Sequence, residues 1–174
     1  MTYKILLVLL CVTLVGCQTT VPFTYSPASA LSAQGELEIG SFEYLPASEE
    51  GLAVDEIDLF GPGKVKIDQP VNTYFEDALF VELRFVGLKL GRGSLTLTGQ
   101  IRNLRWNAFS ANADLSVYYS LIDAQGVPRY GSQIDIRNEY PLDTMITTEQ
   151  VINRAIRTSI EQLLNDPQLR DLIR

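Results

Sequence analysis

The thiol of Cys17 is the side chain with the most definite chemical potential in this sequence, because other reactive groups are scarce. The chain of 174 residues contains no histidine and two cysteines, Cys11 and Cys17. Histidine is the most common general base and metal ligand in proteins. Carboxylate pairs and serine–lysine pairs remain, but no Ser-x-x-Lys motif includes Lys64, Lys66 or Lys89. We therefore expect no enzymatic activity, no catalytic residue, no cofactor and no metal site.

The overall charge argues against a nucleic-acid partner. The chain has 21 acidic and 14 basic residues, a net charge of −7. Binding to phosphate backbones needs clustered lysine and arginine, which displace counterions. The composition, 46% hydrophobic and 20% charged, is that of a globular protein, and the length indicates a single domain.

Residues 1–16 have the pattern of a secretory signal peptide. Lys4 precedes an apolar run over residues 5–15. As a helix this run would extend about 16 Å, which is too short to cross a hydrocarbon core of about 30 Å. A basic start, a short apolar stretch and a small residue before a break are typical of an export signal.

The residues that end this leader, Leu14-Val15-Gly16-Cys17, resemble the lipobox of bacterial lipoproteins. In that family, signal peptidase II cuts just before the cysteine, whose thiol carries a diacylglycerol group. The resemblance implies that Cys17 is lipidated and holds the protein on a membrane, since anchors with two or more acyl chains are stable. The alternative is an ordinary exported protein with a chance cysteine.

The residues after Cys17 bear on location and mobility. Gram-negative lipoproteins with aspartate after the cysteine tend to stay in the inner membrane, and this chain has Gln18. The resemblance therefore implies the outer membrane, with the protein facing the periplasm. The polar stretch that follows contains proline and serine, so we expect residues 17–33 to form the lipidated cysteine and a flexible tether. A single periplasmic domain is expected over residues 34–174.

The first half of this domain shows one strand, one loop and one helix. Apolar residues alternate with polar ones over residues 34–45, which predicts a half-buried strand. Residues 46–69 are rich in carboxylates and glycine, and we expect a solvated acidic loop with a short strand near residues 57–60, not a calcium site. Thr73 and Glu76 have the spacing of a capping box, and the amphipathic helix that they begin is expected to end at Gly87.

The second half reads as three strands and a helix. Alternating patterns predict strands over residues 94–106, 112–123 and 128–140, with a bulge near Arg102 or Asn103. A second capping box, Thr147 and Gln150, begins the last long helix, and Asp166-Pro167 restarts a short one. The fold class is thus expected to be α+β, a two-layer sandwich whose antiparallel sheet of about four strands carries two helices on one face.

The lipobox and the order helix, three strands, helix resemble the YajG-like small lipoproteins of Gram-negative envelopes. The similarity covers about residues 70–174, including the helix that ends at Gly87, the strand 95–101, the hairpin at Gln125-Gly126 and the tail 163–173. The chain is more distantly similar to the auxiliary lipoproteins of envelope ABC transporters. These resemblances imply a non-enzymatic accessory or assembly component.

We therefore expect an anchored domain that binds an envelope or periplasmic protein. A shift in phase of the strand 94–106 is expected to place Trp106 beside Tyr118 on the polar face, and Trp106, Phe109 and Tyr118 are the candidate contacts. Alternatively, Trp106 closes the edge of the core. The competing function is a lipid- or small-ligand-binding module with a pocket between the sheet and residues 46–69.

Overall fold

The computed structural model describes residues 20–107, 112–138 and 147–174. Cys17, Phe109 and Tyr140 lie outside these residues. The elements, in chain order, are β1 (Thr20–Val21), β2 (Glu36–Tyr44), α2 (Leu45–Glu49), β3 (Glu56–Leu59), β4 (Lys64–Ile67), α3 (Val71–Phe85), β5 (Lys89–Leu90), β6 (Leu95–Asn107), β7 (Asn112–Asp123), β8 (Pro128–Asn138), α4 (Thr148–Asn165) and α5 (Pro167–Ile173).

The strands form a mixed sheet of eight, so the expected antiparallel sheet of about four strands is wrong, although the class is still α+β. β6 pairs antiparallel with β7, and β7 with β8. The opposite edge of β6 is shared by β2 along its first half and β3 near its end, both parallel to it. β2 and β6 are parallel because α3 lies between them in the chain and forms the crossover connection that parallel strands require.

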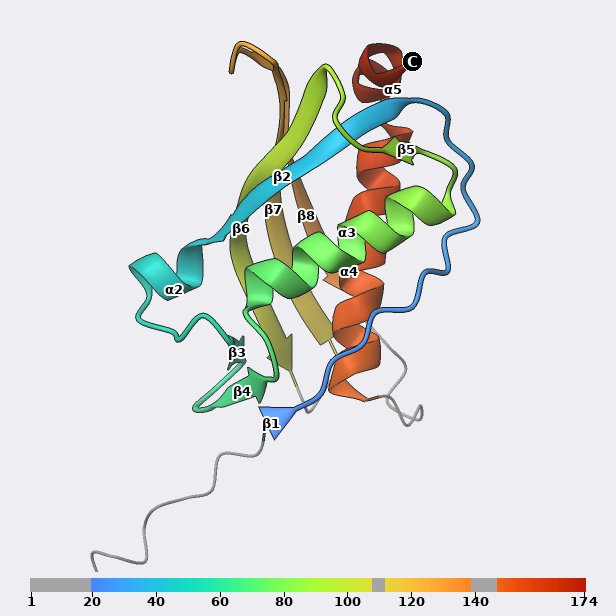
Figure 1. Ribbon diagram of the computed structural model, residues 1–174. Coiled ribbons are helices and arrows are strands. Elements are labelled where there is room, and N and C mark those ends of the chain that lie inside the picture. The colour runs from blue at the N-terminus through green and yellow to red at the C-terminus, as the bar shows by residue number, and fades with distance from the viewer. Residues whose placement is uncertain (1–19, 108–111, 139–146) are drawn as a thin grey trace, which may run out of the picture.

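One face of the sheet carries the two long helices (Figure 1). α3 packs on β2 and α4 packs on β7 and β8. The core lies between these layers, and its largest fully buried side chains include Tyr74, Phe75 and Tyr119. Tyr119 contacts the ring of Phe42 at 5.9 Å between centroids and shares a hydrogen bond of 2.9 Å with Ser159.

The helix ends follow the sequence signals in three cases and depart from them in one. Gly87 ends α3 with a φ of +107°, and its amide donates to the Arg84 carbonyl. The capping box of Thr147 and Gln150 is present, and Asp166 caps α5 by accepting from the Gln168 amide. The expected box at Thr73 is wrong, because Pro70 is the N-cap of α3 and Thr73 already lies in its first turn.

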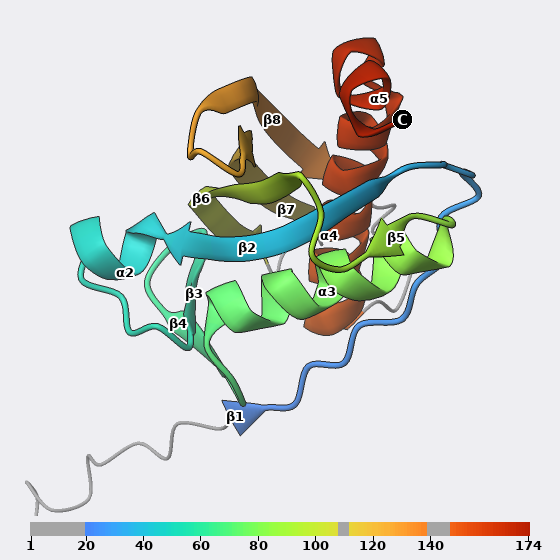
Figure 2. The same cartoon turned by 45° about the horizontal axis from the view of Figure 1, so that its top comes forward.

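Residues 20–33 are not a free tether, since they pack along α3 and α4 (Figure 2). We call them the strap. Val21 pairs with Ile67 of β4, Phe23 is buried in the core, and the Ala33 amide donates to the Val86 carbonyl at the end of α3. The expected flexibility is thus wrong for residues 20–33.

Candidate functional site

The proposed lipidation site, Cys17, comes three residues before Thr20, the first described residue. Thr20 belongs to β1, which pairs with β4 at one end of the molecule. The candidate contact Phe109 also lies outside the described residues. The structure therefore places two of the four candidate residues, Trp106 and Tyr118.

Trp106 and Tyr118 lie on opposite faces of the sheet, so the expectation that they are neighbours is wrong. Trp106 pairs with Ala113, which is fully buried on the helix-covered face, and the indole itself is half-buried against the core. The register of β6 and β7 shifts between Ile101 and Asn103, as the sequence predicts. The bulge adds one residue and thereby returns the later apolar positions of β6 to the same covered face. Trp106 thus closes the edge of the core.

Tyr118 lies on the face that the helices leave uncovered. The guanidinium of Arg102 sits 4.9 Å from the centre of its ring, and Arg102 Nη1 donates to Gln133 Oε1 at 2.6 Å. A Cβ at Gly131 would lie 2.4 Å from the Tyr118 hydroxyl oxygen, so a glycine is needed where this ring crosses β8.

A hollow of about 480 Å³ adjoins Tyr118 on the same face. Its lining comes from β2, β6 and β7 and is formed by Ser41, Phe42, Glu43, Thr98, Gly99, Gln100, Tyr118 and Ser120. A half-exposed aromatic ring beside a polar hollow is a common anchor point at protein interfaces.

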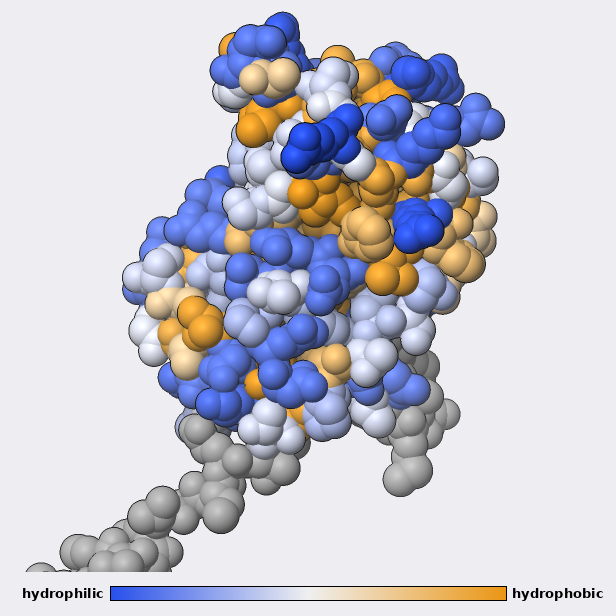
Figure 3. Space-filling view, in the orientation of Figure 1, coloured by the Kyte–Doolittle hydropathy of each residue, from blue (hydrophilic) through white to orange (hydrophobic). Residues whose placement is uncertain are grey.

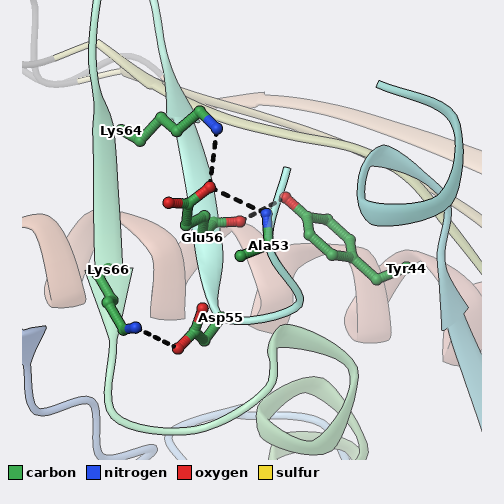
Figure 4. Close-up of polar contacts among 6 residues, drawn as sticks. All are labelled: Tyr44, Ala53, Asp55, Glu56, Lys64 and Lys66. Atoms are coloured by element: carbon green, nitrogen blue, oxygen red, sulfur yellow. Dashed lines mark hydrogen bonds and ion pairs between the residues drawn. The ribbon is translucent and has the colours of Figure 1, made fainter. Parts of the chain in front are cut away.

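The expected acidic loop over residues 46–69 is wrong for most of its length, since it folds into α2, β3 and β4, but β3 confirms the short strand expected near residues 57–60. Figure 4 shows its carboxylates in ion pairs: Lys64 Nζ lies 2.8 Å from Glu56 Oε2, and Lys66 Nζ lies 3.0 Å from Asp55 Oδ2. The Ala53 amide donates to Glu56, and this bond, followed by the one from Lys64, lowers the pKa of the Glu56 carboxyl. Tyr44 donates its hydroxyl hydrogen to the Glu56 carbonyl at 2.9 Å.

These pairs favour a structural role for the acidic residues. The third basic residue of this region, Arg105 on β6, lies 3.0 Å from Asp58 of β3. No group of three or more acidic or cysteine side chains in the described part of the chain is arranged as a metal site.

A hollow of about 430 Å³ adjoins this segment and corresponds to the place expected for a small ligand. It lies between the end of β2, α2 and the start of α3, and its lining is Phe42, Glu43, Tyr44, Ala47, Ser48, Val54 and Asn72. Val54, which lines this hollow, is 56% exposed.

The strap is held by carboxylates, a feature that sequence reasoning missed. Asp68 Oδ1 accepts from the Phe23 amide at 3.2 Å and Glu149 Oε1 from the Thr24 amide at 2.8 Å. Glu82, fully buried in α3, accepts from the Ser29 amide at 2.7 Å and from the Tyr25 hydroxyl at 2.5 Å. Burial, reinforced by this bond to Glu82, raises the pKa of Tyr25 far above its usual value.

A weak signal for the strap was present in the sequence. Val21, Phe23 and Tyr25 alternate with Pro22, Thr24 and Ser26, as in a half-buried extended segment.

None of the helices in residues 20–107, 112–138 and 147–174 has both the length and the hydropathy needed to span a bilayer.

Comparison with known proteins identifies a shared fold and no sequence family. No family model and no curated protein matches the chain. The crystal structure of protein XCC0632 from Xanthomonas campestris, assigned to family model DUF330, aligns over 89% of this chain and 93% of its own, with a TM-score of 0.56 and 12% identity. The crystal structure of an uncharacterized protein covers 88% of this chain and 99% of its own, with the same score and identity.

A minor lipoprotein from Acinetobacter baumannii aligns over 77% of this chain and 92% of its own, with a TM-score of 0.41 and 15% identity, which is too low to support an argument. At 12% identity the first two structures show that the α+β fold is shared and nothing further. The resemblance to YajG-like lipoproteins stays a prediction.

Proposed function

We propose that this chain is a lipid-anchored lipoprotein of the bacterial cell envelope, held in the outer membrane with its domain in the periplasm. The observation that carries the proposal is the sequence Leu14-Val15-Gly16-Cys17, which ends three residues before the folded domain begins at Thr20. A diacylated Cys17 would hold the domain on a membrane without a spanning helix.

The two cysteines allow a matched test of this anchor. Cells that make the full chain are fed a palmitate analogue, and label on the protein is measured after purification. We expect Cys17→Ser to lose the label and to retain the leader, whereas Cys11→Ser should be labelled like the native chain, because Cys11 leaves with residues 1–16. An unlabelled native chain, or label that survives Cys17→Ser, would refute the anchor.

For the role of the domain we propose a non-enzymatic accessory that binds an envelope protein. The uncovered face of β6, β7 and β8 supports this, because Tyr118 offers a half-exposed ring between Arg102 and the hollow of about 480 Å³. Trp106 is a weaker candidate because it packs against the core, and Phe109 lies outside the described residues.

A photo-reactive amino acid at a chosen position would test this face in living cells. At Tyr118 we expect a defined crosslinked product, and at Gln162, which is exposed on α4 in the other layer, we expect none. The product at Tyr118 should weaken when Arg102→Ala is added. Equal products at both positions, or none at Tyr118, would contradict a partner on this face.

The second candidate is a lipid- or small-ligand-binding module, favoured by the hollow of about 430 Å³ beside α2. Native mass spectrometry of the purified protein would show added mass if a ligand is bound. Ala47→Trp, which places a bulky ring in the lining, should then remove that mass. A clean apo mass for the native protein would count against this function.

A further inference from the structure

The outer surface of α3 carries apolar side chains where a surface helix normally carries polar ones. The helix already buries one face against the sheet, with Ala78, Leu79 and Leu83 fully covered. On the opposite side Phe80 is 44% exposed and Phe85 57% exposed. Val81, at 36%, lies between them. We call Phe80, Val81 and Phe85 the apolar patch.

Three cations that form no ion pair with any described residue come within or soon after the apolar patch in the chain. Arg84 lies between Val81 and Phe85, and Lys89 and Arg92 follow in β5 and the turn after it. None of the ion pairs within the described ranges includes these three residues. Figure 3 shows hydrophobic side chains over the C-terminal half of α3 with strongly hydrophilic ones beside them. The chain as a whole carries a net charge of −7. The exposed Asp77 of α3 lies one turn before Phe80, so the cations belong to the C-terminal side of the patch.

The apolar patch lies on the same side of the molecule as the start of the strap. In Figure 2, β1, the strap and α3 occupy the lower side, whereas the turn between β7 and β8 lies at the upper left. Two residues, Gln18 and Thr19, separate Cys17 from Thr20, and the three Cα–Cα steps from Cys17 to Thr20 reach at most about 11 Å. A lipid on Cys17 would therefore bring this side of the domain to the bilayer surface.

We infer that the apolar patch on α3 is a membrane-contact surface, inserted among lipid headgroups while Arg84, Lys89 and Arg92 face lipid phosphates. The inference rests on the proposed lipid anchor at Cys17 and adds a defined orientation to it. Aromatic side chains beside basic ones are the usual composition of a helix that lies in the membrane interface. A protein partner on α3 is the competing occupant.

The test uses the full chain, made in bacteria and purified in its natural form, in vesicles of phosphatidylethanolamine and phosphatidylglycerol. Each variant carries one new cysteine labelled with an environment-sensitive fluorophore, and a lipidated Cys17 leaves no other free thiol. The test positions are Phe80→Cys and Phe85→Cys. Val127→Cys is the matched control, because Val127 is 46% exposed and lies in the turn between β7 and β8.

We expect the labels at positions 80 and 85 to shift to shorter wavelength in vesicles and to be quenched by lipids with nitroxide-bearing acyl chains. The label at position 127 should do neither. A variant in which Arg84, Lys89 and Arg92 are all replaced by glutamine should show a smaller wavelength shift at position 80. An unchanged shift would overturn the role of the cations.

Two further results distinguish the inference from the anchor on which it rests. If the protein floats with the vesicles while the labels at 80 and 85 behave like the one at 127, the membrane-contact surface is wrong and the anchor stands. If the protein without a new cysteine takes up the fluorophore and does not float, Cys17 is a free thiol, and both the anchor and the inference fail.

Discussion

Glu82 offers the sharpest test of how the strap is held on the domain. Its carboxylate is fully buried in α3, and it accepts hydrogen bonds from three groups of the strap: the Ser29 amide at 2.7 Å, the Tyr25 hydroxyl at 2.5 Å and the Ala28 amide at 3.4 Å. The substitution Glu82→Ala removes the acceptor and leaves the buried Ser29 amide without a partner.

The expected loss follows from the cost of unpaired buried groups. A buried donor that loses a charged acceptor costs about 1.5–3 kcal/mol, and the lost bond to Tyr25 adds to this, so Glu82→Ala should lower the free energy of unfolding by about 3 kcal/mol. Glu82→Gln keeps an oxygen for Ser29 and should lose about 1 kcal/mol. Asp77→Ala, an exposed acidic position on the same helix, is the control and should change stability by less than about 0.5 kcal/mol.

Urea unfolding and amide hydrogen exchange measure these effects separately. If the strap can open without the rest of the domain, Glu82→Ala should speed exchange of the Ser29 and Leu31 amides more than that of amides in β7. The reasoning would be refuted if Glu82→Ala were as stable as Asp77→Ala and the strap amides kept their native protection.

Three other positions give independent predictions. Tyr119→Phe should lower stability by about 1 kcal/mol in urea unfolding, because a buried hydrogen bond is lost, whereas Tyr118→Phe should change it by less than about 0.5 kcal/mol. Gly99→Ala should destabilise by about 1–3 kcal/mol, because the new methyl would lie 2.3 Å from a β7 carbonyl oxygen, while Gly91→Ala, which meets nothing within 4 Å, should not. Hydrogen bonds from backbone amides and from an arginine lower the pKa of Asp123 in the folded protein. The stabilisation from Asp123 should therefore be complete above the unfolded-state pKa of about 4 and should be lost as the pH falls through the folded-state pKa. Asp123→Asn should flatten this part of a stability-versus-pH curve.

The buried tyrosines should make the protein less stable as the pH rises into the alkaline range, whereas Asp123 makes it less stable as the pH falls. Burial is the largest cause that raises the pKa of Tyr130 to about 12, and it raises the pKa of Tyr74 and Tyr119 further. A raised folded-state pKa contributes stability that is complete below the unfolded-state value of about 10 and decreases above it. Absorbance titration should therefore show delayed ionisation of these phenols, with loss of structure as they ionise. Ionisation of every tyrosine near pH 10 in the folded protein would contradict their burial.

The long helices and strands were predictable because their apolar residues recur at regular helical or alternating spacing. The buried faces of α3, α4, β6 and β7 contain the residues that the alternating and helical patterns select, including Leu79, Ile101, Val117 and Ile160. The bulge in β6 was also visible in the sequence, but its effect on Trp106 was misread. A break in alternation indicates a bulge, and the extra residue restores the original face for the positions that follow it.

The remaining errors come from interactions between segments far apart in the chain. Glu76 does not cap α3, because its Oε1 accepts from the Phe42 amide of β2, where the register between β2 and β6 shifts. The Lys-Val-Lys-Ile segment of β4 alternates as a half-buried strand should, but the surrounding acidic and glycine residues obscured it. The parallel pairing of β2 with β6 was implied by the order strand, helix, strand, although several short elements intervene.

The packed strap changes what a lipid anchor at Cys17 would do. A free segment from residue 17 to residue 33 could carry the domain as far as about 55 Å from the membrane, whereas the stretch from residue 17 to residue 20 allows about 11 Å. A domain of this size has a radius of gyration of about 15 Å, so every surface of it would stay within a few tens of ångströms of the lipid headgroups. The uncovered face around Tyr118 would then stay close to the bilayer. On the proposed function, a partner that binds this face must itself be embedded in the membrane or extend close to it, because the anchored domain cannot reach across the periplasm to meet it.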